Sequence, residues 1–334
     1  MSKYIYAAGL LAKKEVTYNG GGSPSAATDG VLIDENLKIP ASYANDGSRP
    51  APPGILGHQR RVVPSARVVS FPIKVSAKGS GAAYSSTVAP SGINVLLQAA
   101  GFDAAVAIGA GTESYTYTPT PFANTPTSSV LNAYGRNQMY AITGAYTDLV
   151  LEAQGPVVPT WVFTAHGVMA GAITDVALPA ITYPALTLDP PKATNITFTL
   201  GNLTAAVVRK FTLKMGRHLA PRLNQNAGGH AGFAPGRRAP QLDVTFEATS
   251  LTGTPFTTSS LIDPYQLFEA GTTLACSLNV GTVQYNRWSL TAGNAQIMAA
   301  PLDEDDGPTA MISLSLQLNP TAINNNDDVT FLFN

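Results

Sequence analysis

Apolar and polar residues alternate along many segments of this chain. Clear examples are 69–75, 242–248, 312–318 and 329–333. A period of two residues predicts strands with one apolar and one polar face. The polar faces carry mostly Ser, Thr and Gln, which suits either the lumen of a tube or an ordinary solvated sandwich face. Helical spacing is short, over 90–101 and 264–271, each beginning at Pro and ending at Gly. The pattern predicts a mainly β protein.

The same order of features occurs twice along the chain. Arg60-Arg61 precedes the alternating run that contains Phe71, and Arg237-Arg238 precedes the run that contains Phe246, 175 positions later. In each copy a long loop comes first, and a Gly-, Ser- or Thr-rich linker, a short helix and further strands follow. This repetition predicts two tandem units, each with a short flanking helix.

Prolines mark the boundary between the two units. Pro179, Pro184, Pro190 and Pro191 make 177–192 the best linker candidate. We therefore expect a first domain over 1–180, with an N-terminal arm and a long loop at about 37–63. The second domain is expected over 181–334, with a long loop at about 219–236.

The composition points to a surface covered by partners. Charged residues make up 12% of the chain, about half of the roughly 25% usual in soluble domains. A net charge of −1 and scattered cations argue against a sequence-reading nucleic-acid binder. The single Cys276 is expected to be a small core residue. No signal peptide and no apolar run of about 18 residues are found, so we expect synthesis in the cytoplasm and no membrane span.

No catalytic, cofactor-binding or metal-binding set is found. The four histidines lack ligand spacing, and the chain has no nucleophile elbow, Walker loop or dinucleotide fingerprint. His166 lies on a predicted strand face, where a hydrogen-bonded histidine is the simplest interpretation. We therefore expect a protein that is not an enzyme.

Two charged features have both a plain and a functional interpretation. Asp303-Glu304-Asp305-Asp306-Gly307 is the densest charge and lacks the pattern of a calcium loop. It is expected to be an acidic hairpin turn, or else a patch lining a lumen or meeting a basic surface such as Arg237-Arg238 of a neighbouring subunit. Each arginine pair is either solvated or, because it recurs after a long loop, engaged between subunits.

The ordered features resemble those of the tail tube proteins (major tail proteins) of long, non-contractile-tailed bacteriophages, the siphoviruses. The resemblance covers most of residues 60–334. The segments that carry it are 60–75, the helix Gly92 to Phe102, Tyr115 to Pro119, the strand region to Leu151, Trp161 to Gly167, Arg237 to Pro240, the helix Tyr265 to Gly271, and Asp303 to Gly307 leading into Ala310 to Leu318.

This resemblance implies a β-sandwich in each copy and inner sheets that join between subunits into a β-barrel tube. Rings would stack through long loops, and two tandem domains favour a trimer with pseudo-sixfold symmetry over the family's usual hexamer. Candidate assembly contacts are Arg60, Arg61, Arg237, Arg238, Asp303, Glu304, Asp305 and Asp306. Candidate inter-ring loop residues are Asn224, Gln225, Asn226, His230 and Phe233.

The implied role is structural, in the tail of the virion. Implied partners are further copies of the chain, a tape measure protein, tail terminator and tail tip proteins, and genomic DNA that passes without sequence-specific binding. The alternative is an adhesive or carbohydrate-binding pair of β-sandwiches, which would expose aromatic residues in loops. Trp161 and Trp288 instead lie in predicted strands.

Overall fold

The structure is a computed structural model of the 334-residue chain. It describes residues 8–35, 37–39, 41–46, 63–90, 92–109, 111–121, 124–155, 157–191, 196–201, 203–222, 231–247, 264–299, 302–306, 309–323 and 325–334. For 41–46, 63–67, 204–206, 264–266, 302–306 and 309–310 only the course of the backbone is described.

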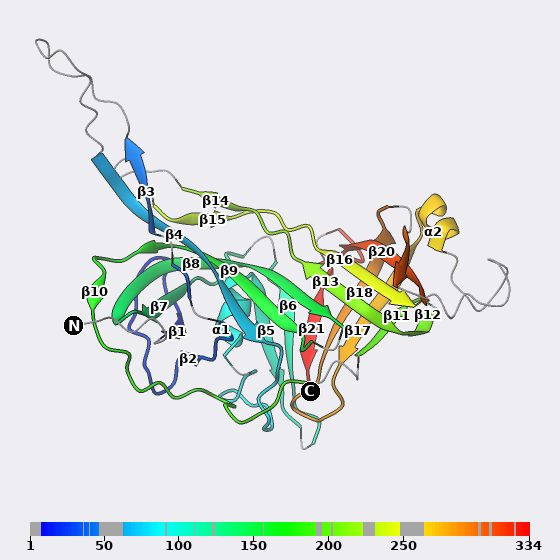
Figure 1. Ribbon diagram of the computed structural model, residues 1–334, viewed down its shortest axis with the longest axis horizontal. Helices are drawn as coiled ribbons and strands as arrows, with labels where there is room; N and C mark the ends of the chain where they lie inside the picture. Colours follow the sequence, from blue (N-terminus) through cyan, green and yellow to red (C-terminus); the bar gives the residue numbers. More distant parts are fainter. Residues whose placement is uncertain are drawn as a thin grey trace, which may run out of the picture.

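Strands dominate the chain, as the alternation predicts, and the fold is a β-sandwich (Figure 1). The strands are β1 Ala8–Lys14, β2 Gly30–Val31, β3 Ala41–Asp46, β4 Val63–Ser76, β5 Phe102–Ala107, β6 Ser114–Pro119, β7 Ser129–Gly135, β8 Gln138–Gln154, β9 Thr160–Met169, β10 Thr174–Asp175, β11 Ile196–Leu200, β12 Leu203–Ala206, β13 Val208–Lys214, β14 Leu219–Pro221, β15 Phe233–Pro235, β16 Gln241–Glu247, β17 Thr273–Val280, β18 Trp288–Ile297, β19 Leu302–Asp306, β20 Thr309–Asn319 and β21 Thr330–Phe333. The helices are α1 Asn94–Ala99 and α2 Pro264–Ala270.

One layer is an antiparallel sheet that runs through both halves of the chain. Its strands follow one another in the order β3-β4-β9-β8-β13-β16-β20-β19. The join between the halves is the pairing of β8 with β13, in which Leu151 faces Leu213. We call this layer the inner sheet.

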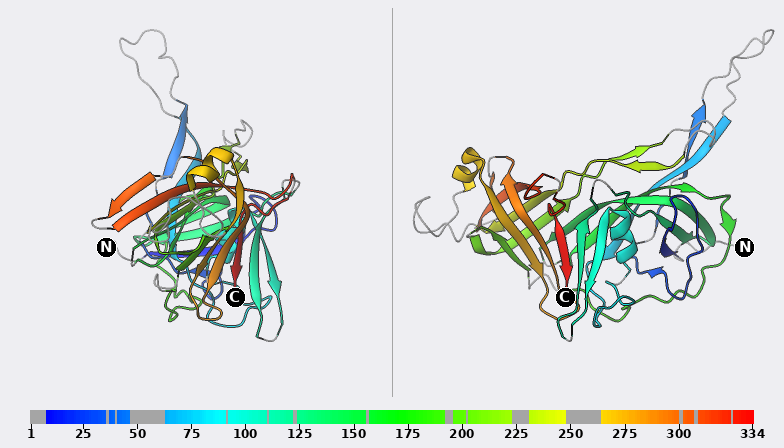
Figure 2. Two further views of the ribbon diagram at one scale, coloured as in Figure 1. Left: turned by 90° about the vertical axis from the view of Figure 1, so that its right-hand side faces the viewer. Right: turned by 180° about the vertical axis from the view of Figure 1, so that it is seen from behind.

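The second layer packs against the apolar face of the inner sheet (Figure 2). Its strands run in the order β5-β6-β21-β18-β17-β11-β12. The C-terminal strand β21 lies between β6 and β18 and so joins the halves in this layer as well. β7 pairs with β8 and with β1, and β1 pairs with β2, which covers the remaining side of the first half around α1.

The core between the layers is continuous across the two halves. Trp161 of β9 and Trp288 of β18 are 0% and 1% exposed, with ring centroids 5.5 Å apart. Phe331 lies 5.0 Å from the Trp161 ring in an edge-on contact. Trp288 Nε1 donates to the carbonyl oxygen of Ala77 at 3.3 Å, whereas Trp161 Nε1 has no hydrogen-bond partner among the described residues. Burial of these large rings is a main source of stability.

The expected strand alternation and the expected burial of Cys276 are confirmed. On β4 the buried residues Phe71 and Ile73 alternate with accessible neighbours, and β9 alternates over its whole length. Cys276 is 3% exposed, and this burial raises the pKa of its thiol to about 12, as for an unreactive core thiol. No helix of the described chain is long and apolar enough to cross a membrane.

Three local predictions differ from the structure. The first helix is shorter than 90–101, because α1 covers only Asn94–Ala99, without a side-chain cap. The described part of the acidic run is not a turn, because Leu302–Asp306 is the strand β19, which pairs with β20. Part of the expected loop at about 37–63 is the strand β3. Both strands are poor in β-branched and aromatic residues, so pairing with a neighbour rather than propensity creates them.

Candidate assembly surfaces and lumen face

The polar face of the inner sheet is the largest candidate functional surface. On β9 the side chains of Thr160, Thr164 and His166 lie opposite to Trp161 and Phe163, because successive residues of a strand point to opposite faces. The facing positions of β8, β13, β16 and β20 are half-buried or exposed as well. They are Asp148, Val150, Glu152, Gln154, Lys210, Thr212, Lys214, Gln241, Asp243, Thr245, Glu247, Ser313, Ser315 and Gln317.

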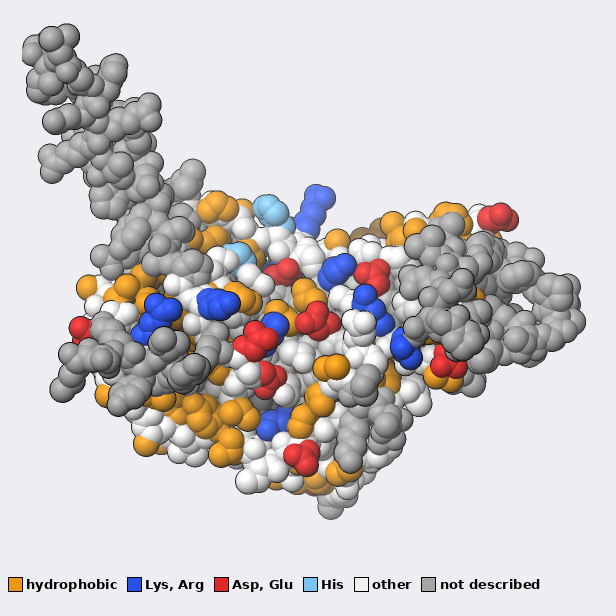
Figure 3. Space-filling view, viewed as in Figure 1, with side chains coloured by type: hydrophobic (Ala, Val, Ile, Leu, Met, Phe, Trp, Pro, Cys, Tyr) orange, Lys and Arg blue, Asp and Glu red, His pale blue; other side chains and the backbone are white. Residues whose placement is uncertain are grey.

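Charges of both signs are interspersed on this face. Lys214 Nζ lies 3.2 Å from Asp243 Oδ2, and Lys74 Nζ lies 2.9 Å from Glu35 Oε1 at the other side of the sheet. Ser315 Oγ donates to Asp243 Oδ1 at 2.7 Å. In the space-filling view, Lys and Arg side chains alternate with Asp and Glu over the middle of the molecule (Figure 3). Among the side chains that the structure describes, this face therefore offers no continuous basic track to a polyanion.

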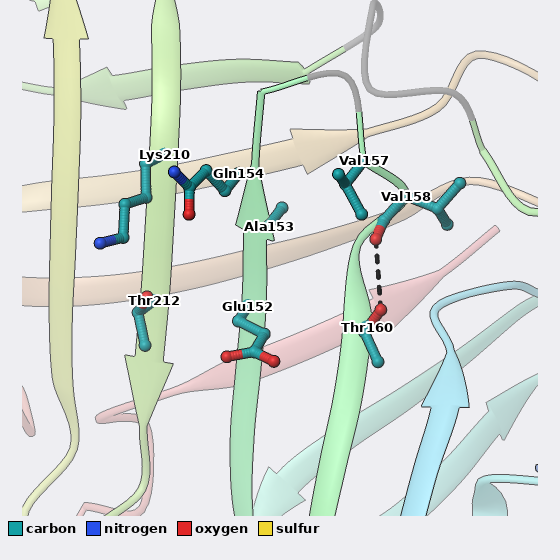
Figure 4. Close-up of a pocket in the computed structure, with 8 residues that line it drawn as sticks. All are labelled: Glu152, Ala153, Gln154, Val157, Val158, Thr160, Lys210 and Thr212. Carbon is teal, nitrogen blue, oxygen red and sulfur yellow. Dashed lines mark hydrogen bonds between the residues drawn. The ribbon is translucent and has the colours of Figure 1, made fainter. Parts of the chain in front are cut away.

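A shallow hollow of about 280 Å³ lies on this face where the two halves meet. Glu152 of β8 and Lys210 and Thr212 of β13 line it, together with Val157 and Val158 of the β8–β9 turn (Figure 4). The polar side chains among them come from strands on either side of the join. They do not form a pair in which one side chain could act as a nucleophile and another as its base.

His166 is half-buried on the same face and packs against an aromatic ring. Its ring centroid lies 5.5 Å from that of Phe233. Burial lowers the pKa of His166, and the nearby carboxylate of Asp148 acts in the opposite direction. Packing against β15 therefore favours the neutral form of the histidine.

The second arginine pair divides into one bound and one exposed residue. Arg238 makes a bidentate ion pair with Asp328, with Nε–Oδ2 2.7 Å and Nη2–Oδ1 2.8 Å. The Asp328 side chain is 5% exposed, whereas Arg237 is exposed. The first pair, Arg60 and Arg61, lies outside the described residues, as do Asn224, Gln225, Asn226 and His230.

Replacing Arg238 with Ala is expected to lower the free energy of unfolding by about 3 kcal/mol, because Asp328 would stay buried without its cation. Arg237→Ala is the matched control, and we expect it to change stability by less than about 0.5 kcal/mol. Chemical denaturation of the two variants provides the comparison. Equal losses would contradict the assignment of Arg238 to the fold.

The second long loop begins as a hairpin that lies on the first half. Its strands β14 and β15 pair with each other, and Phe233, an expected loop residue, is 6% exposed. The Tyr18 hydroxyl donates to the carbonyl oxygen of Phe233 at 3.0 Å and accepts from its amide at 2.7 Å. Gly232, at φ +101°, is needed here because a Cβ would lie only 2.0 Å from the Tyr18 hydroxyl.

Tyr18→Phe is expected to weaken this hairpin by about 1–2 kcal/mol, because both polar backbone groups of Phe233 lose the hydroxyl. Amide hydrogen exchange over β14 and β15 should speed up in the variant. Tyr140→Phe serves as the control, since the Tyr140 hydroxyl makes only a 3.4 Å contact with Gln138. Unchanged protection in the Tyr18 variant would show that ring stacking alone holds the hairpin.

The sequence did not predict the aromatic side chains that support this hairpin. Tyr18 stacks on Tyr146 with centroids 5.5 Å apart, and the Arg217 guanidinium lies 5.6 Å from the Tyr146 ring. Burial lowers the pKa of Arg217 to about 10, and its Nη1 donates to the carbonyl oxygen of Ala99 at 2.9 Å. These residues are far apart in sequence and follow no shared pattern, so no sequence signal points to them.

At each margin of the inner sheet a described strand pairs on one side only, and next to β19 the residues 316–319 of β20 pair with β18. β3 pairs only with β4, and β19, which contains Asp303, Glu304, Asp305 and Asp306, pairs only with β20. An open strand edge presents unpaired backbone groups to another chain.

Within the described residues, no group of three or more His, Cys, Asp or Glu side chains could hold a metal ion.

A strand-rich block with edge strands that pair on one side only is suited to assembly with further chains. Its sequence matches the family model described as phage tail tube protein over residues 6–330. The chain therefore belongs to the phage tail tube protein family, which confirms the predicted resemblance to tail tube proteins. It is a structural component of the phage tail and hence of the virion. No curated protein matches the chain significantly.

Proposed function

We propose that three copies of this protein form a ring, that the rings stack into the tail tube, and that the tube conducts genomic DNA during ejection. The observation that carries this proposal is the inner sheet. It contains the strand order β3-β4-β9-β8 followed by β13-β16-β20-β19. In each set, two strands that flank a long loop lie next to two consecutive strands that pair with each other.

The repeated order supports two tube-like units, which we assign to 1–180 and 181–334. Each unit contributes four strands to one sheet, so one chain occupies the place of two single-domain subunits. Three chains would then give a pseudo-sixfold ring, with six chains as the alternative outcome. Closing the sheet around an axis would pair both open margins, which a free chain leaves unprotected.

The polar face supports a lumen for DNA. Its Ser, Thr and Gln side chains and its mixed charges, such as Lys214 beside Asp243, provide few sites that could hold phosphate. Each phosphate contact would add affinity and slow the transit of DNA. We assign no catalytic step to the protein. Tape measure, terminator and tip proteins are the further partners that a tube of defined length requires.

The adhesive alternative finds no support in the aromatic residues. It expected aromatic side chains exposed in loops, whereas Trp161 and Trp288 are buried in the core. We therefore do not adopt it.

Negative-stain electron microscopy of the concentrated protein, with rotational averaging of end-on views, tests the proposed function. We expect hollow stacked rings with three alternating pairs of lobes. Six equivalent pairs would replace the trimer by a hexamer. A dispersed monomer at high concentration, with purified tail tip added as a nucleus, would contradict self-assembly into a tube.

A further inference from the structure

We propose that the join between the two halves of one chain is the template for the contact between chains: β3 of one copy pairs, antiparallel, with β19 of the next. The inference rests on the proposed ring assembly and goes beyond it by naming the strands and their register. The occupant of each open margin is a second copy of this chain.

The four strands of each half occupy equivalent places. β4 and β16 each follow a long loop and each pair with the last long strand of their half, β9 or β20. β8–β9 and β19–β20 are consecutive hairpins. β3 and β13 each precede the long loop. Since β13 pairs with β8, the equivalent partner of β3 is β19. The other described strands that have a single partner, β2, β5, β10, β12, β14 and β15, lie outside the inner sheet.

The register of the last two strands follows from the two phenylalanines of the repeat. Phe71 faces Ala165 of β9, and Phe246 faces Ile312 of β20, so Ala165 and Ile312 are equivalent.

The same comparison gives the register of the strands β8 and β19, which pair with β9 and β20. Ala165 faces Thr147 of β8, and Ile312 faces Asp303 of β19. Thr147 and Asp303 are therefore equivalent, which aligns β19 with the middle of β8.

The strands before the long loops align in the same way. Val69 and Val244 each lie two residues before their phenylalanine. Val69 faces Ala41 of β3, and Val244 faces Phe211 of β13. Ala41 and Phe211 are therefore equivalent.

The pairing within the chain then predicts the pairing between chains. Lys214 of β13 faces Val150 of β8. Phe211 is equivalent to Ala41, so Lys214, three residues later, corresponds to Ala44. Thr147 is equivalent to Asp303, so Val150, three residues later, corresponds to Asp306. We therefore expect Ala44 of one copy to face Asp306 of the next copy.

The hairpins agree with this template. β14–β15 leaves the second half and lies over the first half, where Tyr18 and Tyr146 hold it. In Figure 1 the β3–β4 hairpin points beyond the outer side of the first half, away from the second. In a ring built on the template, this hairpin lies over the second half of the neighbouring copy, just as β14–β15 lies over the first half of its own.

Paired cysteines test the contact, because the native Cys276 is 3% exposed and will not interfere. Ala44→Cys with Asp306→Cys, and Asp46→Cys with Glu304→Cys, share the predicted register. Ser42→Cys with Glu304→Cys departs from it by four residues, which separates the Cα atoms by more than the roughly 7 Å limit for a disulfide. Glu152→Cys with Thr212→Cys, facing residues of β8 and β13, is the intrachain control.

After mild oxidation, non-reducing gels of tubes and of unassembled protein report the links. We expect the two in-register variants to link chains to each other at least tenfold more than the shifted variant, and the control to link only within a chain. Chain-to-chain links in soluble rings would support the pairing even if tubes failed to form. The failure to form tubes would then count only against the proposed stacking of rings. Links no stronger than those of the shifted pair, in variants that fold, would overturn the pairing while leaving the tube role intact.

Discussion

Replacing residues 224–230 with a short Gly-Ser linker is expected to abolish stacked tubes and to leave folded, unstacked rings. The segment is the tip of the second long loop, which we propose to contact the next ring. The stem of the hairpin should survive, because two backbone hydrogen bonds close it below the tip. The Arg222 amide donates to the carbonyl oxygen of Gly232 at 2.8 Å, and the Ala231 amide donates to the carbonyl oxygen of Arg222 at 2.7 Å. Electron microscopy and sedimentation would separate rings from tubes.

A turn of the outer layer provides the matched control for this replacement. Residues 108–112 belong to the connection between β5 and β6, and Ile108 is 70% exposed. The same linker placed there should leave tube length unchanged. Tubes of normal length from the variant at 224–230 would refute an inter-ring role of the loop, and loss of folded protein would show instead that the tip belongs to the fold.

Trp161→Ala is expected to lower the free energy of unfolding by about 3–5 kcal/mol. The ring is 0% exposed and packs on Trp288 and Phe331, so its removal leaves a cavity where the two halves share one core. Chemical denaturation should therefore show one transition at lower denaturant rather than the loss of one half. Val157→Ala, at a 59% exposed position, should change stability by less than about 0.5 kcal/mol.

The indole nitrogens allow a finer comparison of the two tryptophans. Trp161→Phe removes an N–H that has no partner among the described residues, whereas Trp288→Phe removes the donor to Ala77. We expect Trp288→Phe to cost about 1 kcal/mol more than Trp161→Phe. The reverse order would show that packing, not hydrogen bonding, separates the two positions.

The strands with clear alternation were predictable because their signal is local. On β9, each side chain between Trp161 and Met169 is buried or accessible according to its own position, so a period of two specifies the strand without its partners. The same holds for α2 between Pro264 and Gly271, where a proline and a glycine mark the ends. Short helices with weak caps, such as α1, are less well defined by such signals.

The candidate assembly residues were predictable only in part. The recurrence of the arginine pairs drew attention to Arg238, but the sequence did not indicate that Asp328 would bind it. Their pairing depends on a turn of the chain some 90 residues later, and no local pattern encodes such a contact. The acidic run was found by its charge, whereas its strand conformation depends on pairing with β20.

By itself, the sequence determined that the protein is mainly β, that its features occur twice, that it lacks a catalytic motif, and that it resembles tail tube proteins. Those properties follow from the polarity and order of residues along the chain. Only the tertiary structure decided that β8 pairs with β13, that one core serves both halves, and that β3 and β19 are the open margins. A strand's own residues fix which side it buries, but its neighbour is chosen by contacts among residues far apart in the chain.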